Sequence, residues 1–541
     1  MTAAAMPMPA FAAPAKPKSN KWLVAVSVTF GTLMGAIDAS IVNVALSQIR
    51  GAVGATVQEI TWISTGFAIA TVMVMPLTGF FGRLFGQKNV YLACLLLFVA
   101  GSFLCGLAWN LPSLIIFRAI QGFGAGALQP TEQAILRQTF PPKEQGTAMA
   151  LFAMAVMVGP ALGPTLGGLI VDNFHWSWIF FINVPVGILG FFMVSRFVHE
   201  PEDLKEAARK EAEKQRKHMD WMGIALLWTA LISLQYLLEE GQAADWFESP
   251  LIVSVTILTV FAFIAFVIRE LTAEAPAVNL RLFQDRTFAS GTLAAAGMFA
   301  VMMSGMFLLP LFMQELLGFT ATQSGLALMP RTLAMMACMP IAGMLYRRLS
   351  PAVMAGTGLI ITAFGQFMLS GLTLESSSSA IMSSLLFQGL GMSLMMVPLQ
   401  TVALSNVPRE RMSDATGLSS LMRQIGGSVG VAAFATILSR HAIIASAGVR
   451  AHLTADRPEV ASRLAATENG LLARGMDAAT AHSMALMQFA GRVARQGMVI
   501  AFDHLFVIGA LCFVAILPAI LLLRRPAQAA AAGAPAHVEM E

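Results

Sequence analysis

The chain of 541 residues consists largely of apolar runs about 20 residues long, and this feature limits its possible folds more than any other. Runs of this length match helices that cross a bilayer, whereas a membrane barrel is made of alternating strands about ten residues long. Charged residues make up only 12% of the chain, which is about half the share found in a soluble domain. We therefore expect an all-α polytopic membrane protein.

About fourteen membrane-spanning helices are predicted from the apolar runs, and we number them spans 1 to 14. The expected spans are residues 22–49, 60–81, 89–108, 112–137, 146–171, 176–197, 220–239, 250–269, 287–314, 321–346, 351–373, 379–405, 412–440 and 499–524. The first run is longer than the apolar part of a signal peptide and contains Asp38, so we interpret it as a retained span.

Lysine and arginine are concentrated in the loops on one side of the predicted bundle. These loops carry Arg83 and Lys88, Arg137 and Lys143, the segment from Lys205 to Lys217, Arg281 and Arg286, Arg347 and Arg348, Arg409 and Arg411, and Arg524 and Arg525. The short loops on the opposite side contain almost no basic residue beyond Arg50. Because basic residues favour the cytoplasmic side, we expect both termini in the cytoplasm. The basic residues thus report orientation in the lipid bilayer, and no nucleic-acid partner is expected.

The spans divide into two halves that are separated by an insertion. The expected parts are a cytoplasmic N-terminal tail (1–21), an N-terminal six-helix bundle (22–197), a charged cytoplasmic linker (198–219), two inserted transmembrane helices (220–269), a C-terminal six-helix bundle (287–524) that includes a periplasmic loop (441–498), and a cytoplasmic C-terminal tail (525–541). Mixed charge and many alanines indicate that the linker is a solvated connector. The periplasmic loop is unusually long, so it is either functional or a loose insertion.

An internal repeat relates the two halves. The recurring segments are 117–124 with 387–391, 79–83 with 343–348, and 158–168 with 417–430. The offsets are similar, about 260 to 270 residues, and internal repeats of this kind are common in transporter folds. The repeat therefore favours two related six-helix halves.

Span 5 contains an unusual line of glycines. Gly159, Gly163 and Gly167 lie one helical turn apart, so they fall on one face of the helix. In a bilayer, such a line lets a neighbouring backbone approach closely. Pro160 and Pro164 each remove a helix hydrogen bond and favour a bend. We expect this helix to pack tightly, to bend, or both.

Ionisable side chains inside spans are candidate functional residues, because a charge in hydrocarbon is costly unless it is paired or hydrated. Asp38 lies near the middle of span 1 and suits reversible protonation, or it forms a structural hydrogen bond to a neighbouring helix. Arg118 of span 4 is a permanent cation that either tunes proton release from a nearby carboxylate or is a static partner of Asp38. Glu132, deeper in span 4, binds a proton or a cationic substrate, or extends to the cytoplasmic interface.

Four further ionisable residues are weaker candidates. Glu315 and Asp503 lie near outer ends of spans, where a solvated role fits equally well. Arg331 and Arg423 are interpreted as helix-packing or gating residues. Among the 35 methionines and 36 phenylalanines, most fill membrane helices, and a fraction can line an adaptable cavity for small hydrophobic substrates.

Several chemistries lack their sequence signatures. The chain has no phosphate-binding loop of the ATPase type, no catalytic nucleophile constellation and no metal-ligand spacing. We therefore expect no enzyme activity, no catalytic residues, no metal and no cofactor, and we do not expect transport driven by ATP bound to this chain.

The motifs resemble signatures of the major facilitator superfamily, in particular of its fourteen-span drug:proton antiporter branch. The gating-loop signature after span 2 is matched by Gly79, Gly82, Arg83, Gly86 and Lys88. Gly82 stands where an aspartate is often found, and this departure weakens any charge-relay role of the loop.

Signatures of spans 1, 4 and 5 are also matched. Asp38 with residues 43–46 resembles the span 1 signature, and Arg118 with residues 121–126 resembles the span 4 signature linked to proton coupling. The span 5 antiporter signature is matched by Gly159, Pro160, Gly163, Pro164, Gly167 and Gly168. Runs at 175–185, 241–249 and 318–322 are similar to multidrug efflux pumps of the EmrB type. Glu132 departs from that type, in which a small polar residue is more usual, so its role is not inherited.

The resemblance implies a major facilitator fold of two six-helix bundles plus two inserted helices. It implies proton-driven export of hydrophobic toxic compounds across the bacterial inner membrane, together with a periplasmic adaptor (a membrane fusion protein) and an outer-membrane channel. The loop 441–498 is then a candidate docking element. The resemblance also implies that span 5 meets span 10 of the other half, where tight packing would seal the cavity against proton leak.

Two alternatives stay open. The first is a proton-driven exporter of an endogenous metabolite such as a siderophore, a fatty acid or a secondary metabolite. The second is a non-transporting membrane receptor or scaffold, against which the buried Asp38 and Arg118 and the repeat argue.

Overall fold

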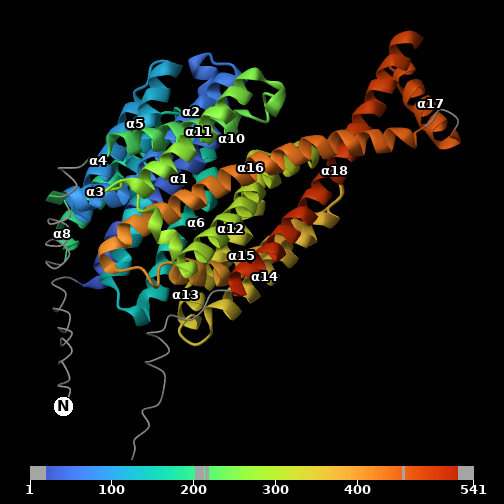
Figure 1. Ribbon diagram of the computed structural model, residues 1–541. Helices are drawn as coiled ribbons and strands as arrows, with labels where there is room; N and C mark the ends of the chain where they lie inside the picture. The colour runs from blue at the N-terminus through green and yellow to red at the C-terminus, as the bar shows by residue number, and fades with distance from the viewer. Residues whose placement is uncertain (1–19, 201–211, 214–218, 454–456, 522–541) are drawn as a thin grey trace, which may run out of the picture.

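The computed structural model describes residues 20–200, 212–213, 219–453 and 457–521, and its regular structure in these ranges is helical (Figure 1). The predicted C-terminal tail, nearly all of the N-terminal tail and most of the linker 198–219 lie outside the described residues. The fold class predicted from the sequence is confirmed.

The N-terminal half consists of the helices of the first six predicted spans. These are α1 (Lys21–Val53), α2 (Val57–Val74) continued by η1 (Met75–Leu77) and α3 (Thr78–Phe85), α4 (Gln87–Gly106), α5 (Leu111–Thr139), α6 (Gln145–Asn173), and α7 (Trp178–Phe181) followed by α8 (Asn183–Phe197). The inserted helices are α10 (Trp221–Glu240) and α11 (Pro250–Thr272).

The C-terminal half follows the same order with longer final helices. It contains α12 (Arg286–Leu311) continued by η5 (Phe312–Leu316), α13 (Ala321–Leu345), α14 (Pro351–Met368), α15 (Ser378–Ala403), α16 (Met412–Ala451), α17 (Pro458–Leu472) and α18 (Ala478–Leu521). Thirteen helical segments of the described chain are long and apolar enough to cross a membrane. The remaining predicted span corresponds to α6, which has 29 residues, includes some whose side chains are not described, and is not among the thirteen.

Local sequence signals account for several helix starts. The Asn20 side chain accepts a hydrogen bond from the Trp22 N–H at 3.0 Å, which satisfies a free donor at the start of α1. A reciprocal capping box formed by Thr56 and Glu59 starts α2. Similar boxes start α5 and α13. These polar caps divide the apolar sequence into separate helices.

Glycines of α5 and α15 show that the two halves are packed alike. A Cβ at Gly122 would lie 2.5 Å from the Phe67 carbonyl oxygen of α2, and one at Gly124 would lie equally close to the backbone of α4. In the other half, Gly389 and Gly391 are pressed in the same way against the backbones of α13 and α14. Each inner helix therefore sits between corresponding neighbours, which is the packing that the predicted repeat requires.

Hydrogen bonds and an ion pair join the two halves at one end of the bundle. We call this end, where α1, α6 and α12 begin and α3, α5 and α13 end, the base. Arg83 of α3 pairs with Asp414 of α16 there. The Gln133 amide donates to the Gln400 side-chain oxygen at 3.3 Å, and the Gln138 amide donates to the Arg409 carbonyl at 3.1 Å. The two halves are thus held together at the base.

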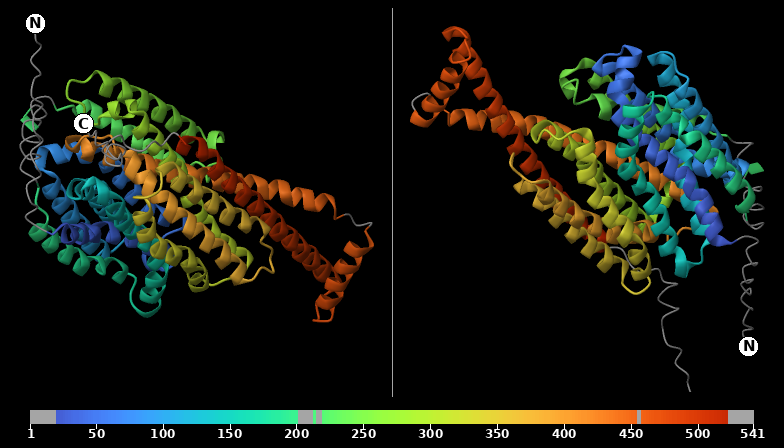
Figure 2. Two further views of the ribbon diagram at one scale, coloured as in Figure 1. Left: turned by 90° about the horizontal axis from the view of Figure 1, so that it is seen from below. Right: turned by 180° about the vertical axis from the view of Figure 1, so that it is seen from behind.

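The predicted periplasmic loop is helical. Helix α16 has 40 residues and α18 has 44, and both continue out of the bundle without a break. Together with α17 they form a projection, which we call the arm (described residues 441–453 and 457–498) and which points away from the base (Figures 1 and 2). The sequence of this segment shows helical spacing, for example at Leu486, Phe489 and Val493. The structure confirms helices there and shows that two of them are continuous with spans 13 and 14.

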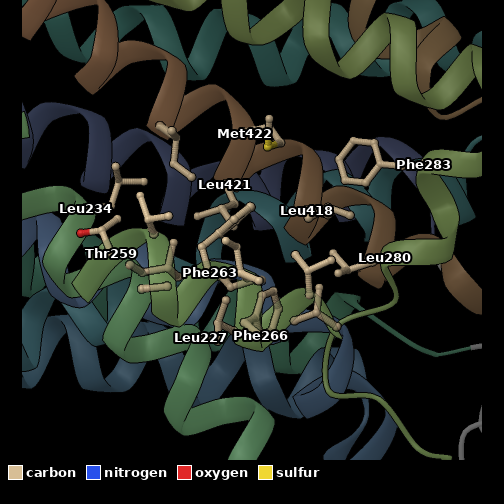
Figure 3. A pocket seen from close by; sticks show the side chains of 18 residues that line it. Leu227, Leu234, Thr259, Phe263, Phe266, Leu280, Phe283, Leu418, Leu421 and Met422 are labelled. Carbon is tan, nitrogen blue, oxygen red and sulfur yellow. The ribbon is translucent and has the colours of Figure 1, made fainter. Parts of the chain in front are cut away.

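The inserted pair α10–α11 packs against both halves. The Trp228 indole N–H of α10 donates to the Met73 carbonyl of α2 at 3.1 Å. Gln235 of α10 donates to the Ser428 hydroxyl of α16 at 3.2 Å. Between the pair and α16 lies a cavity of about 350 Å³ lined mostly by apolar side chains such as Leu227, Phe263 and Leu421, with Thr259 also in its wall (Figure 3). It contains no charged group, so it is not a site for proton chemistry.

Candidate functional site: a buried charge network

Asp38 and Arg118 meet in the centre of the N-terminal half. Both are buried, with 0% and 1% of their surface exposed. The Arg118 Nη1 donates to the Asp38 Oδ2 at 2.5 Å, so α1 and α5 are joined by an ion pair. The other carboxylate oxygen, Oδ1, accepts bonds of 2.9 Å from the side-chain amides of Gln121 and Asn183. Every oxygen of this buried carboxylate is therefore satisfied by a charged or polar partner.

A second ring of contacts positions those partners. The Gln121 amide also donates to the Ser102 hydroxyl at 2.5 Å, and its oxygen accepts from the Arg118 Nη1 at 2.6 Å. The guanidinium of Arg118 lies 4.1 Å from the centre of the Phe67 ring, where the π face stabilises the cation. Ser102 and Asn183 are members that the sequence interpretation missed. The only available signal for Asn183 was an amide inside an otherwise apolar run.

The glycine line of α6 lies directly against the helix that carries Asp38. A Cβ at Gly159 would overlap the Ala36 backbone, and one at Gly163 would meet the Ser40 side chain at 2.5 Å. These two contacts flank Asp38 along α1. The prediction of close packing is thus confirmed for this part of α6, which is one uninterrupted helix.

The neighbour of the glycine line differs from the one that the sequence implied. Helix α6 does meet α13, the helix of span 10, as expected. That contact is made at the base, where a Cβ at Gly146 would lie 3.2 Å from the Gly343 carbonyl oxygen. Gly159 and Gly163 instead face α1 in the same half, because α6 is packed between α1 and α13. Their close packing therefore bears on Asp38 and not on the seam between the halves.

Glu132 lies on α5 about four helical turns nearer the base than Arg118. It is 0% exposed, so the alternative that it extends to the interface is wrong. The Thr29 hydroxyl of α1 donates to its Oε1 at 3.2 Å, while Oε2 has no hydrogen-bond partner among the described residues. A buried carboxyl group with one free oxygen can take up a proton or a cationic group, and this remains one of the roles expected for Glu132.

The gating loop after α2 contacts the other half. Arg83 pairs with both carboxylate oxygens of Asp414 at the start of α16. A Cβ at Gly79 would overlap the Asp414 carboxylate, so glycine is needed for this approach. Gly82 gives the loop no carboxylate of its own, and Asp414 of α16 is the carboxylate that pairs with Arg83. That Gly82 weakens a charge-relay role of the loop stays a prediction. The sequence interpretation missed Asp414, although it stands in the first turn after a basic loop.

The rest of the gating loop is fixed to the end of α8. Gly86 has φ +83°, a backbone conformation that favours glycine. The Lys88 backbone N–H donates to the Glu200 carboxylate at 2.6 Å, and its ammonium donates to the Ser195 carbonyl at 2.7 Å. The loop is thus held in place around Arg83.

The weaker candidates do not join this network. Arg331 and Arg423 are buried in the C-terminal half, with 6% and 5% exposed. Glu315 is exposed, in agreement with a solvated role. Asp503 is partly exposed, and its Oδ1 has no partner among the described residues. No group of three or more histidine, cysteine or acidic side chains that could hold a metal occurs in the described part of the chain.

Comparison with known proteins identifies the family of the chain. Residues 28–431 match the family model of the Major Facilitator Superfamily. The chain is 31% identical over 513 residues to the fatty acid resistance protein FarB of Neisseria gonorrhoeae, covering 95% of this chain and 98% of FarB. It is 32% identical over 517 residues to the multidrug export protein EmrB of Escherichia coli (strain K12), with the same coverage.

A solved structure shows the same fold. The human organic anion transporter MFSD10 superposes with a TM-score of 0.57 at 13% identity, covering 92% of this chain and 100% of MFSD10. At this identity the likeness concerns the fold alone. The match to the family model and to full-length relatives shows that this chain belongs to the major facilitator superfamily.

Proposed function

We propose that the chain is a proton-coupled antiporter that exports hydrophobic and amphipathic toxic compounds across the bacterial inner membrane. The observation that carries the proposal is the buried Asp38–Arg118 ion pair, with Gln121 and Asn183 on the second carboxylate oxygen. A carboxylate in the membrane interior is a functional candidate by default, and this one has partners that depend on its charge. The names of EmrB and of other relatives support drug export as the activity.

Protonation of Asp38 provides a physical step for coupling. A neutral carboxyl group no longer attracts the Arg118 guanidinium, so the strongest bond between α1 and α5 weakens. Because α6 packs on α1 around Asp38 and also on α13, a shift of α1 is passed to the interface between the halves. The contacts at the base then open, and the two halves rock about the substrate cavity.

The substitution Asp38→Asn tests the proposal. The unaltered protein is reconstituted in proteoliposomes whose lumen contains a pH-sensitive dye. Addition of ethidium outside should release protons from the lumen, and the dye reports the change in luminal pH. Asp38→Asn should abolish this release, while the protein still inserts and elutes as a single species. Proton release that persists in the variant would contradict the proposed role of Asp38.

An endogenous metabolite remains the second candidate cargo, because the relative FarB is named for fatty acid resistance. The two candidates share the same mechanics and differ in substrate. A growth-inhibition panel in a pump-deficient strain, containing drugs, bile salts and fatty acids, distinguishes them. Protection restricted to one class of metabolite would favour the second candidate.

The arm is the proposed docking element for a periplasmic adaptor, which would connect the pump to an outer-membrane channel. In the orientation expected from the basic loops, the base and both termini are cytoplasmic. The arm presents exposed Leu486 and Met487 beyond the predicted end of span 14, and exposed apolar pairs outside the bilayer suit a protein contact. Helices α16 and α18 touch at its root, where a Cβ at Gly497 would lie 2.9 Å from the Ser446 Cα.

Because α16 and α18 touch at the root of the arm, the arm can be deleted and the two helix ends joined by a short linker. Removing residues 446–497 and joining the ends with a short glycine–serine linker should leave proton-coupled transport in vesicles intact and abolish co-purification of the adaptor. The double substitution Leu486→Ser and Met487→Ser is the milder variant and should weaken co-purification. Unchanged adaptor binding in the deletion variant would sink the docking role of the arm.

A further inference from the structure

Two arginines in the C-terminal half are buried without a carboxylate partner. Arg331 of α13 forms no hydrogen bond or ion pair with any residue that the structure describes. Arg423 of α16 donates only to the hydroxyls of Ser419 and Ser420, at 3.0 and 2.8 Å, and lies 5.7 Å from the Phe299 ring centre. Neither contact neutralises the charge, and an arginine cannot lose its proton in a protein.

The buried carboxylates of the two six-helix halves have other surroundings. Asp38 is paired with Arg118, and Asp414 is paired with Arg83. Glu132 accepts from Thr29 within the N-terminal half. The two arginines are therefore excess positive charge in a part of the protein where an unpaired charge is costly.

The two arginines lie at a similar depth. Counting from the helix ends at the base, Arg331 is about 21 Å and Arg423 about 16 Å along the helix axis, since each residue adds about 1.5 Å. Both positions fall in the middle of a bilayer about 30 Å thick. The two arginines thus lie at a similar depth near mid-membrane, on two different helices, and are too deep to reach a lipid headgroup.

Arg331 lies on a buried side of α13. It continues the helical stripe of Met335, Met339 and Ala342, which are spaced three or four residues apart. These three residues belong to the large apolar cluster of the C-terminal half, which also includes Ala153 of α6. Helix α15 lies beside Arg331 itself, because a Cβ at Gly389 would overlap the Arg331 carbonyl oxygen.

Arg423 lies on the buried polar side of α16. Thr416, Ser419 and Ser420 share this face of the helix and are at most 3% exposed. The opposite face carries Leu418, Leu421, Met422 and Ile425, which line the apolar cavity next to α10–α11 (Figure 3). Helix α16 also packs against α5 of the other half. Arg423 thus points away from the lipid-side cavity and into the protein interior.

We propose that Arg331 and Arg423 recognise the anionic group of an acidic, amphipathic substrate such as a long-chain carboxylate. The guanidinium group matches a carboxylate in geometry and charge, and an incoming anion would supply the partner that the protein lacks. Met298, Met302 and Met396 are packed in the buried cluster of the same half, and their flexible side chains can change rotamer to accommodate an apolar chain. The proposal rests on the proposed function, since it names a substrate class for that exporter.

Direct binding tests this site without any gradient. Radiolabelled dodecanoate is bound to the purified full-length protein in a scintillation proximity assay, with methyl dodecanoate and dodecyltrimethylammonium as uncharged and cationic ligands of matched chain length. Arg423→Gln and Arg331→Gln should each weaken dodecanoate binding about tenfold or more, because a charge-assisted bond is lost. Binding of the other two ligands should stay unchanged. Arg423→Lys should retain part of the affinity, because it keeps the charge and loses the bidentate geometry.

Two controls keep the outcome decisive. Arg281→Gln removes an exposed arginine of the base and should leave dodecanoate affinity unaltered. For the unaltered protein, dodecyl sulfate should compete with dodecanoate, and dodecyltrimethylammonium should not, so the test does not depend on the folding of any variant.

The proposal is overturned if both glutamine variants bind dodecanoate normally, or if all three ligands lose affinity equally. Dodecanoate binding that is absent, or that does not depend on the two arginines, together with intact proton-coupled ethidium export would reject this site and leave the proposed function standing. Arginine-dependent binding without proton coupling would do the reverse.

Discussion

The two halves of the molecule share one scaffold and carry opposite chemistry. Gly159 and Gly163 of α6 face Ala36 and Ser40 of α1, and in the other half Gly426 and Gly430 of α16 face Ala296 and Ala300 of α12. The same spacing therefore brackets one position in each half. That position is Asp38 in the N-terminal half and Met298 in the C-terminal half.

The comparison extends to the partner of Asp38. Arg118 lies one turn before Gly122 of α5, and Leu385 lies one turn before the equivalent Gly389 of α15. Met298 and Leu385 are as buried as the charged pair that they replace. The scaffold is therefore stable with apolar residues at both places, so the ion pair is not required for packing. A buried ion pair that the fold can replace by methionine and leucine is best explained by function.

The largest expected effect comes from giving the N-terminal half the residues of the C-terminal half. Asp38→Met leaves Arg118 unpaired and should destabilise the protein by about 3–5 kcal/mol. The double substitution Asp38→Met and Arg118→Leu should recover most of this loss, since the repeat tolerates that pair. The stability of the single and double variants is compared by heating them in detergent and measuring the folded fraction by size-exclusion chromatography. Both variants should lack proton release, and a double variant less stable than Asp38→Met would break the analogy between the halves.

Most of the fold and part of the site could be predicted from the sequence. Apolar runs, basic loops and glycine spacing report on helices and on close helix contacts, so the fold class and the tight packing of α6 were accessible. Asp38 and Arg118 were identifiable because charges are rare inside spans. Asn183, which donates to Asp38, and Ser102, which accepts from Gln121 and Asn183, were not, since small polar residues are common in membrane helices and only the tertiary arrangement brings them together. Asp414 was missed because it stands in the first turn of α16 and its partner Arg83 lies on a helix of the other half.

A glycine substitution separates packing from proton coupling. Gly163→Leu and Gly430→Leu both force a side chain against a neighbouring helix and should each cost about 1–3 kcal/mol of stability. Only Gly163→Leu moves the helix that carries Asp38, so only this variant should uncouple transport or block it. Gly168→Leu is the matched control, because nothing lies within 4 Å of a Cβ there. Equal coupling defects in Gly163→Leu and Gly430→Leu would show that proton coupling depends equally on close glycine packing in both halves.

The contact between Arg83 and Asp414 tests how the halves are joined at the base. Arg83→Gln and Asp414→Asn should each weaken the base and favour states in which it is open. A double-mutant cycle on thermal stability should give a coupling of about 0.5–3 kcal/mol, because both groups touch directly. Spin labels on α5 and α15 near the base would report the separation of the halves. Additive single effects would mean that the pair does not act as a latch.

The smallest effect is expected from the exposed carboxylate of the C-terminal half. Glu315→Gln removes a charge that is already solvated, so proton-coupled transport should change by about twofold at most. Glu132→Gln is its buried counterpart and removes a carboxyl group whose Oε2 has no partner among the described residues. If Glu132 takes up a proton or a cation, its substitution should alter ethidium transport well beyond the effect at Glu315 and leave dodecanoate binding intact. Identical behaviour of the two variants would assign Glu132 to the scaffold, and Asp38 would then be the one carboxylate by which the N-terminal half differs in function from its repeat.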